Sequence, residues 1–542
     1  MKLIKPILYS TVAVALASCS TAGNIAKKEV PQGPNVVIDL PAKKAELTEE
    51  EGKNWQHYDL ATDTIPGMSV YKAYEFLKGK KGVEVIVGVV DSGTDLKHED
   101  LKDVAWVNED EIPGNGIDDD KNGYVDDING WNFLGKSYEE HLEYERILMN
   151  PSIADEETLS EVKKYQEKQV TKAKKTKARY ENFLSGVVFS KNALDNHFKK
   201  ETYTFDDIRS IKTENNELKQ AIGFALNFVE ANGMTMESME KALRDEIEKS
   251  IKTINGDNLK TDYRKVVGDN AYDINDKPGY GDGNIGHTVK EESHGTHVTG
   301  IVGAKRDNGK GIDGVATNVK LMAVRSVSNG DEYDKDVALG IRYAVDNGAK
   351  VINTSFGKGF SPNKEWIYDA IKYAAEKDVL IVNAAGNSSE NIDVDKSFPN
   401  DTPDGINEVA DNFITIGAMS ANYNKELPAS FTNYGKVNVD VFAPGVAIYS
   451  TTPDSEYGKK SGTSMASPAV AGVAALIRSY YPELTASQVK RILMNSGTKI
   501  DFKVLKPGGK GELVPFSDLS VSGRVVNAYN ALRMADRLVN GK

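Results

Sequence analysis

The nine residues "VEVIVGVVD", at positions 83–91, indicate the fold more clearly than any other stretch of the chain. The run is apolar and rich in β-branched residues, which is typical of a strand buried on both faces of a sheet. Asp91 ends the run, so a carboxylate stands where the predicted strand stops. Runs of the same kind recur at "VKLMAVRSV" (319–327), "KVINTSFG" (350–357), "VLIVNAAGN" (379–387), "FITIGAMS" (413–420) and "VDVFAPG" (439–445).

Helical patterns separate several of these predicted strands. "DKDVALGIRYAVDNG" (334–348) and "KEWIYDAIKYAAEKD" (364–378) carry apolar residues at the spacing of one helix face. Strands that alternate with helices predict an α/β domain, in which a mostly parallel sheet is covered by helices on both faces. We expect residues 54–136 and 256–540 to form this domain.

The region from 137 to 255 departs from that alternation. It is rich in Lys, Glu and Asp, and its longest helix-forming stretch is "ADEETLSEVKKYQEKQVTKAKKTKARYENFL" (154–184). We predict an inserted, all-helical subdomain. The alternative is a long solvated excursion without a role of its own.

The chain begins with "MKLIKPILYSTVAVALASCS" (1–20), in which Lys2 and Lys5 precede a short apolar core. This pattern is typical of an export signal and predicts a signal peptide of residues 1–18. "LASC" resembles the lipobox of bacterial lipoproteins, in which the cysteine becomes an acylated N-terminus, and Cys19 is the only cysteine of the chain. An ordinary signal peptide in which Cys19 stands by chance is the alternative.

Residues 19–53 are polar and charged, which favours a flexible, lipid-anchored tether. We therefore expect an exported bacterial lipoprotein that is held at a membrane by its N-terminal lipid and faces the periplasm or the cell surface. The net charge of −13 argues against nucleic acid as a partner, because phosphate backbones bind basic surfaces.

Three polar residues stand at the ends of predicted buried elements. Asp91 ends a strand, and the ends of parallel strands are where ligands bind in α/β sheets. His294, in "ESHGTHVTGIVGA" (292–304), and Ser464, in "SGTSMASPAVAGVAALI" (461–477), each open a predicted buried helix. Each residue alone has a structural explanation, such as capping or close packing. Their occurrence together is a far stronger signal than any one of them alone.

The same stretches carry a family resemblance. "DSGTDLKHEDL" (91–101), "HGTHVTGIVGA" (294–304) and "GTSMASPAVAGVAALI" (462–477) resemble the three catalytic motifs of subtilisin-like serine proteases, and they occur in the family's order. "VINTSFG" and "AAGN" match two further blocks. The resemblance implies a subtilisin-like fold and a serine endopeptidase that acts on polypeptide substrates and needs no cofactor for its chemistry.

The resemblance also assigns roles to residues of this chain. It makes Ser464 the nucleophile, His294 the general base and acid, and Asp91 the carboxylate that orients the imidazole. The side-chain amide of Asn387 and the backbone N–H of Ser464 are implied as donors to the oxyanion. His297 is expected to be a packing residue.

The resemblance further implies an extended substrate. Ser355, Phe356 and Gly357 match the strand that pairs its backbone with the peptide. Ala385 and Gly386 match a wall of the pocket that receives the residue before the scissile bond.

A second motif indicates a structural metal. In "DDDKNGYVDDIN" (118–129), calcium-loop positions are occupied by Asp118, Asp120, Asn122, the Tyr124 carbonyl and Asp126. The twelfth position is Asn rather than the bidentate Glu of an EF-hand. We predict structural calcium bound by these residues, and the alternative is a turn with solvated acids.

Asp100 also matches a calcium ligand of the family, at another place in the fold.

For function, the competing hypothesis is an inactive protease-fold scaffold whose helical insertion binds partner proteins.

Overall fold

The computed structural model describes residues 25, 28–33, 43, 45–200 and 203–541. Cys19 and the predicted signal peptide lie outside the described residues. The chain divides into two compact units, one of residues up to 143 and from 263 onward and one of residues 144–262. Within the described ranges, no helix combines the length and the apolar character that crossing a membrane requires.

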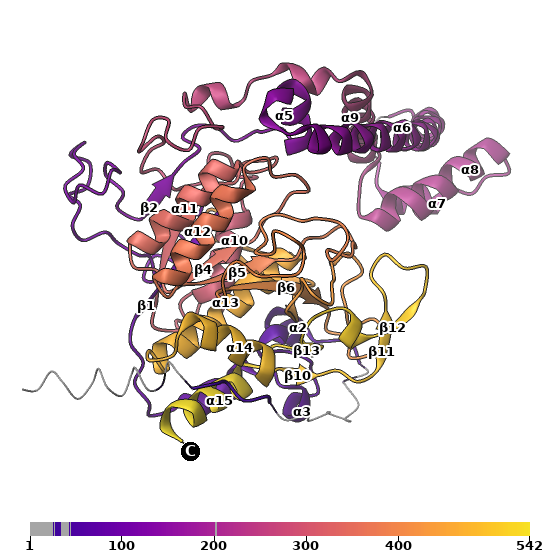
Figure 1. Cartoon of the computed structure of the whole chain (residues 1–542). Helices are drawn as coiled ribbons and strands as arrows, with labels where there is room; N and C mark the ends of the chain where they lie inside the picture. The colour runs from indigo at the N-terminus through magenta and orange to yellow at the C-terminus, as the bar shows by residue number, and fades with distance from the viewer. Residues whose placement is uncertain (1–24, 26–27, 34–42, 44, 201–202, 542) are drawn as a thin grey trace, which may run out of the picture. The chain divides into compact units, whose positions relative to one another are not determined.

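A nine-stranded sheet forms the centre of the larger unit (Figure 1). Neighbouring strands are parallel except at one edge, where β10 and β13 are antiparallel. The order across the sheet is β10-β13-β7-β6-β5-β4-β1-β3-β2. The strands are β1 (Val85–Asp91), β2 (Gly130–Asn132), β3 (Val319–Arg325), β4 (Val351–Thr354), β5 (Leu380–Ala384), β6 (Phe413–Met419), β7 (Val441–Pro444), β10 (Thr498–Lys499) and β13 (Arg524–Val525).

Helices cover both faces of this sheet. Side chains of β1 alternate between two hydrophobic clusters, with Val87 and Val89 in one and Val90 in the other. The first cluster packs against α4, α10, α13, α14 and α15, and the second against α11 and α12. The predicted α/β class is therefore confirmed. These helices are α4 (Val70–Leu77), α10 (His294–Gly303), α11 (Asp334–Asp346), α12 (Lys364–Glu376), α13 (Thr463–Tyr480), α14 (Ala486–Ser496) and α15 (Ala528–Asn540).

The small residues of α13 allow it to pack closely. A Cβ atom added at Gly472 would lie 2.6 Å from Val315 Cβ, so no larger residue fits there without movement. Two antiparallel hairpins complete the unit. They are formed by β8 (Ile448–Thr452) with β9 (Glu456–Lys460), and by β11 (Lys503–Leu505) with β12 (Leu513–Pro515).

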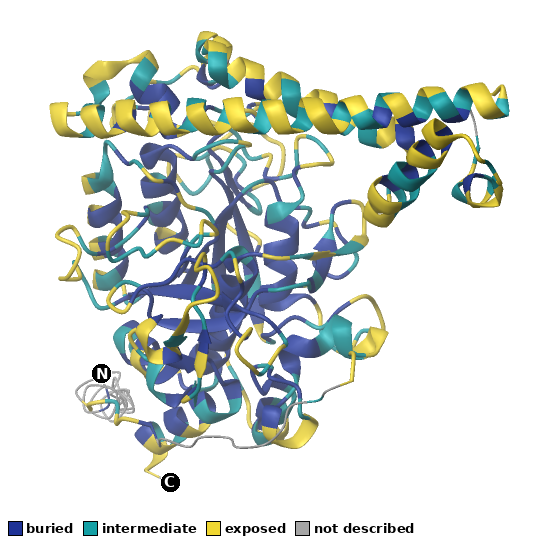
Figure 2. Ribbon diagram, turned by 90° about the vertical axis from the view of Figure 1, so that its right-hand side faces the viewer, coloured by how far each residue is buried: buried dark blue, intermediate teal, exposed yellow. Residues whose placement is uncertain are grey.

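The smaller unit is helical throughout its regular structure. Its core is formed by buried residues such as Val187 and Leu194 on α6 and Leu243 on α9. Figure 2 shows that α6 is exposed along most of its length, whereas the strands of the central sheet are buried. The helices are α5 (Glu143–Met149), which starts one residue before the unit, α6 (Glu156–Phe198), α7 (Phe205–Ser210), α8 (Asn216–Phe224), which continues into a π-helical turn (Ala225–Val229), and α9 (Met236–Asn255).

Both boundaries of the helical unit lie a few residues further along the chain than the predicted bounds of 137 and 255. At the first boundary, the segment before the unit pairs with the loop after β3. The backbone N–H of Asn329 donates to the Tyr138 carbonyl at 2.6 Å, and that of Glu140 donates to the Asn329 carbonyl at 3.1 Å. These bonds hold residues 138–143 in the larger unit, although their composition resembles the helical region.

Parts of the predicted flexible tether of residues 19–53 contact the larger unit or form a helix. Gln488 donates to the backbone carbonyls of Ile25 and Lys28, and Ile25 is buried. Helix α2 (Glu49–Asn54) is capped by Thr48, which exchanges two hydrogen bonds with Glu51. Composition missed these contacts because Ile25 finds its apolar neighbours far away in the sequence.

Candidate active site

Three of the predicted site residues lie at ends of elements. Asp91 is the last residue of β1, where it is in register with Arg325 of β3. His294 is the first residue of α10, and Ser464 is the second residue of α13. Strand and helix ends of this kind expose backbone groups that can bind a ligand.

Asp91 and His294 are in direct contact. His294 Nδ1 lies 2.7 Å from Asp91 Oδ1, and the Asp91 side chain is buried whereas that of His294 is 37% exposed. A carboxylate oxygen only accepts hydrogen bonds, so the proton of the neutral imidazole lies on Nδ1. The exposed ring nitrogen, Nε2, is thereby left with a lone pair that can accept a proton.

The Ser464 hydroxyl does not contact His294 in this structure. Its Oγ donates to the Ser355 backbone carbonyl at 3.0 Å, and no hydrogen bond joins Ser464 Oγ to His294 in the described chain. A serine hydroxyl reaches other acceptors by rotation about one bond. Hydrogen bonds between catalytic groups are commonly long in substrate-free enzymes and shorten when substrate binds.

Pro468 accounts for the second hydrogen bond between Ser464 and Ser355. A helical residue at position 468 would normally donate its N–H to the Ser464 carbonyl, but proline has none. The Ser355 hydroxyl supplies the missing donor, at 3.0 Å from the Ser464 carbonyl. The predicted substrate strand is therefore tied directly to the helix that carries the serine.

Asn387 is held in one orientation by its neighbour. Its Oδ1 accepts from the backbone N–H of Thr463 at 2.9 Å and from the Thr463 hydroxyl at 3.1 Å. Its Nδ2 and the Ser464 backbone nitrogen both lie close to Gly462, because a Cβ added there would lie 3.5 Å and 3.6 Å from them. Two hydrogen-bond donors are thus available close to the serine.

A cavity of about 350 Å³ adjoins these groups. One side is formed by the loop after β3, and the other by residues after β4. Its lining residues are Val327, Gly330, Glu332, Phe356, Gly357, Ala384, Gly386, Asn387, Ser388, Thr463 and Ser464. A second cavity, of about 390 Å³, shares Ala384 with the first and is lined by Ala385.

Sequence reasoning missed an ion pair that holds the segments around Asp91 and His294. Glu292 Oε1 accepts from Arg325 Nε at 2.7 Å and from the backbone N–H of Gly93 at 2.9 Å, and both charged side chains are buried. The only signal was a Glu two residues before His294 and an Arg at the end of an apolar strand.

His297 is fully buried, and its Nε2 lies 3.1 Å from the carbonyls of Ile448 and Gly458. Burial lowers the pKa of His297 to about 3, so it is neutral at physiological pH.

Three of the five predicted calcium ligands contact one another, because the Asn122 N–H donates to Asp118 at 3.1 Å and to Asp120 at 2.9 Å. The side chains of the set also bind nearby backbone groups. Asp126 accepts from the backbone N–H groups of Gly114, Asn115 and Gly116, and Asp118 accepts from that of Gly123. Asn122 and Tyr124 are joined to each other, because the Tyr124 N–H donates to the Asn122 side chain at 2.8 Å. The cause is local, since short acidic side chains in a turn capture nearby backbone donors.

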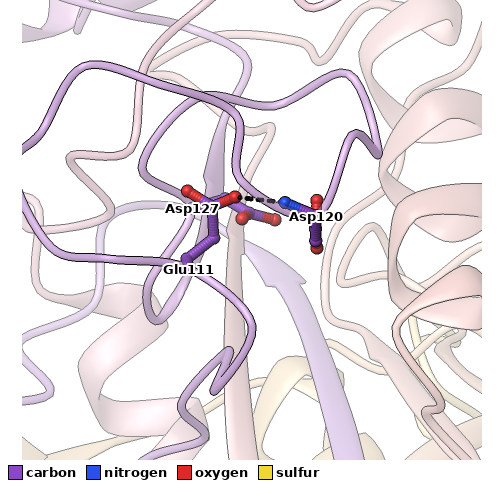
Figure 3. Close-up of side chains that lie close together, drawn as sticks. All are labelled: Glu111, Asp120 and Asp127. Atoms are coloured by element: carbon purple, nitrogen blue, oxygen red, sulfur yellow. Dashed lines mark hydrogen bonds between the residues drawn. The ribbon is translucent and has the colours of Figure 1, made fainter.

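A different acidic cluster contains only Asp120 of the predicted set. Glu111, Asp120 and Asp127 each offer an oxygen within 4.8 Å of the others (Figure 3). Glu111 and Asp127 are buried, and burial raises the pKa of Asp127. Asp100, the other residue considered for calcium, accepts from Asn308, Ile312 and Tyr457.

Comparison with known families matches residues 82–511 to the subtilase family. Subtilisin DY of Bacillus licheniformis is 41% identical over 210 residues, which are 38% of this chain and 71% of that protein. Thermitase of Thermoactinomyces vulgaris is 40% identical over 208 residues, 38% of this chain and 68% of that protein. Among solved structures, a cold adapted subtilisin-like serine proteinase is 31% identical and covers 43% of this chain and 74% of its own, with a TM-score of 0.34.

Proposed function

The chain belongs to the subtilase family of serine endopeptidases, and from this premise we propose that Asp91, His294 and Ser464 form its catalytic triad. The observation that carries the proposal is the 2.7 Å contact between His294 Nδ1 and Asp91 Oδ1, which leaves Nε2 free to act as a base. The substrates are polypeptides, as the family's peptidase activity requires.

In the proposed reaction, Ser464 Oγ leaves the Ser355 carbonyl and attacks the carbonyl carbon of the scissile peptide bond. His294 Nε2 takes the hydroxyl proton and then gives it to the leaving amine, so that an acyl-enzyme forms and the new N-terminus departs. A water molecule attacks the ester by the same route, and the proton returns to Ser464. Asp91 stays ionised throughout and stabilises the imidazolium.

The negative charge of each tetrahedral intermediate falls on the former carbonyl oxygen. We assign its stabilisation to Asn387 Nδ2 and to the Ser464 backbone N–H, because both nitrogens lie close to Gly462 and to the serine. The helix dipole of α13 adds to this stabilisation, since its positive end lies at the same place.

The cavity next to Ser464 supports an extended substrate. Residues 355–357 would add the peptide as a further strand, and residues 327–332 would contact it from the other side. Gly386 and Ala385 border the space for the residue before the scissile bond, and they line the first and the second cavity respectively.

We also propose that the protein is an exported lipoprotein, anchored through an acylated Cys19 and facing the periplasm or the cell surface. The support is the sequence alone, in which a charged start and an apolar core precede "LASC".

We propose a structural calcium ion at Glu111, Asp120 and Asp127, a set that shares only Asp120 with the ligands predicted from the sequence. Their oxygens lie close enough to share one cation, and carboxylates are the ligands that calcium prefers. The ion would neutralise buried like charges and would take no part in catalysis.

The test of the proposed function is loss of activity without loss of structure. Ser464→Ala should reduce casein hydrolysis by about 10⁴–10⁶ while its melting temperature stays within about 2 °C of wild type. Casein cleavage at the wild-type rate would reject the triad. An inactive wild type would instead favour the scaffold hypothesis, which the family membership does not support.

A further inference from the structure

Two walls border the cavity beside Ser464, and they come from different parts of the sheet. The first wall is the loop after β3, which contributes Val327, Gly330 and Glu332. The second wall follows β4 and contributes Phe356 and Gly357. A peptide that runs between them needs both walls at a fixed separation, because strand pairing tolerates little change in distance.

Lys358 follows the second wall directly and reaches the first. Its side chain is 2% exposed, and its Nζ donates to the backbone carbonyl of Glu332 at 2.8 Å. The same Nζ donates to Glu143 Oε2 at 2.6 Å and lies 2.9 Å from Asp334 Oδ1. One buried ammonium group therefore joins both walls and the segment that leads into the helical unit.

The backbone of Lys358 is fixed independently of its side chain. Its N–H donates to the Phe398 carbonyl at 2.8 Å, and its carbonyl accepts from the Phe398 N–H at 2.9 Å. Asp334 is fixed as well, because it accepts from the Ser361 hydroxyl and the Asn363 N–H at 2.8 Å each. Both the backbone of Lys358 and its partner Asp334 are therefore held in place by other hydrogen bonds.

The first wall is also held from its outer side. The N–H of Asp331 donates to the His141 carbonyl at 3.2 Å, and the N–H of Glu143 donates to Asp331 Oδ2 at 2.7 Å. A Cβ added at Gly330 would lie 2.3 Å from the Glu140 carbonyl oxygen, so these segments touch closely. Residues 138–143 therefore cover the wall's outer edge, while Lys358 holds it from the cavity's other wall.

The two carboxylates around the Lys358 side chain require a cation at this position. Glu143 and Asp334 are both buried, and without the ammonium group two carboxylates would face one another in a medium that solvates them poorly. They would then separate or take up a proton, and either response changes the position of the first wall.

We propose that Lys358 is a positioning residue that sets the separation of the two walls and thereby the binding of substrate residues before the scissile bond. The inference rests on the proposed function, because it assumes that substrate lies in this cavity. Lys358 does not touch the reacting atoms. Its loss should weaken the binding of peptides long enough to run between both walls and leave the chemistry at Ser464 intact.

The experiment compares a long substrate with a short reagent in Lys358→Met. The long substrate is the best wild-type substrate from a fluorogenic library with four residues before the leaving group. We expect its KM to rise about tenfold or more, with kcat within about twofold. The short reagent is a fluorophosphonate probe, which needs only the serine, its base and the oxyanion donors, and its labelling rate should stay within about twofold of wild type.

Lys335→Met is the matched control. Lys335 is also buried, and its Nζ donates to Asp269 at 2.8 Å and to the carbonyls of Asn270 and Asp276 at 3.0 Å each. None of these partners lines the cavity. The KM of Lys335→Met for the long substrate should remain within about twofold of wild type, even if its melting temperature falls as much as that of Lys358→Met.

An equal KM in Lys358→Met and wild type would overturn the proposed role of Lys358. An equal rise of KM in both lysine variants would overturn it as well. If Lys358→Met does not fold, two other variants test the proposal. Lys358→Arg should keep KM within about threefold because it retains the cation, and Glu143→Gln should raise KM for the long substrate without slowing the labelling by the probe. Failure of both expectations would overturn the proposal. A wild type that does not react with the probe would instead refute the proposed function.

Discussion

Replacement of Asn387 by alanine separates transition-state stabilisation from substrate binding. Asn387 Oδ1 accepts two hydrogen bonds from Thr463, and Asn387 Nδ2 lies close to Gly462, as the Ser464 backbone nitrogen does. Loss of one such donor costs about 2.7–4 kcal/mol, a magnitude that comes from subtilisin itself. At about 1.36 kcal/mol per factor of ten, kcat should fall by about 10²–10³. KM should stay within about twofold, because the oxyanion exists only after attack.

The assay is steady-state hydrolysis of a fluorogenic peptide, with enzyme concentrations normalised by active-site titration. Two hydrogen bonds to Thr463 are also lost, so a stability decrease of about 1 kcal/mol per bond is expected and must be measured by urea unfolding. Thr463→Ser is the control, since it keeps both donors to Asn387 and should change kcat by less than about threefold. A stable Asn387→Ala enzyme with unchanged kcat, or with a raised KM alone, would refute the assignment of this amide to the oxyanion.

Three further outcomes are expected. The wild-type protein should partition into detergent, whereas Cys19→Ser should give a soluble form or an unprocessed precursor. A wild-type mature N-terminus downstream of Cys19, found in membrane-free fractions, would reject the anchor. Chelation should lower the melting temperature, because a calcium concentration of a hundred times the dissociation constant stabilises the folded protein by about 2.7 kcal/mol. Asp120→Ala should remove most of this sensitivity to chelator. A wild-type melting curve that chelator does not shift would exclude a stabilising site. Burial lowers the pKa of His297 to about 3, so the unfolded chain binds more protons and stability should fall as pH drops from about 6.5 toward 3. His297→Gln should lessen that decline in urea midpoints at pH 7 and pH 4.5, and equal declines in both proteins would contradict the burial of a neutral imidazole.

The sheet could be predicted from sequence because parallel strands that are buried on both faces form runs made mostly of apolar residues. The run that becomes β1 (Val85–Asp91) shows this property, and so do the runs of β3 to β7. The buried helix after Ser464 was recognisable for a related reason, because close packing against Val315 requires a small residue at Gly472.

Groups that come together only through folding could not be predicted in the same way. Glu111 lies outside the acidic stretch that suggested calcium, yet its carboxylate accepts from the N–H groups of Asp119, Asp120 and Asp126 and so reaches the middle of that loop. Lys358 reads as a surface residue by its charge, and only the fold places carboxylates around its buried ammonium group.

The contact between Asp91 and His294 was expected from a resemblance rather than from physics. Their positions are 203 residues apart in the chain, and a helical unit lies between them in sequence. Periodicity could place each residue at the end of an element, but it could not say that the two ends meet.

Stoichiometric labelling by a fluorophosphonate probe tests whether Ser464 is the nucleophile and His294 its base. One probe molecule should attach per wild-type chain, and peptide mass spectrometry should find it on Ser464. His294→Ala should slow labelling by about 10³ or more because the base is lost. Labelling at another serine, or equal rates in wild type and His294→Ala, would contradict the proposed triad.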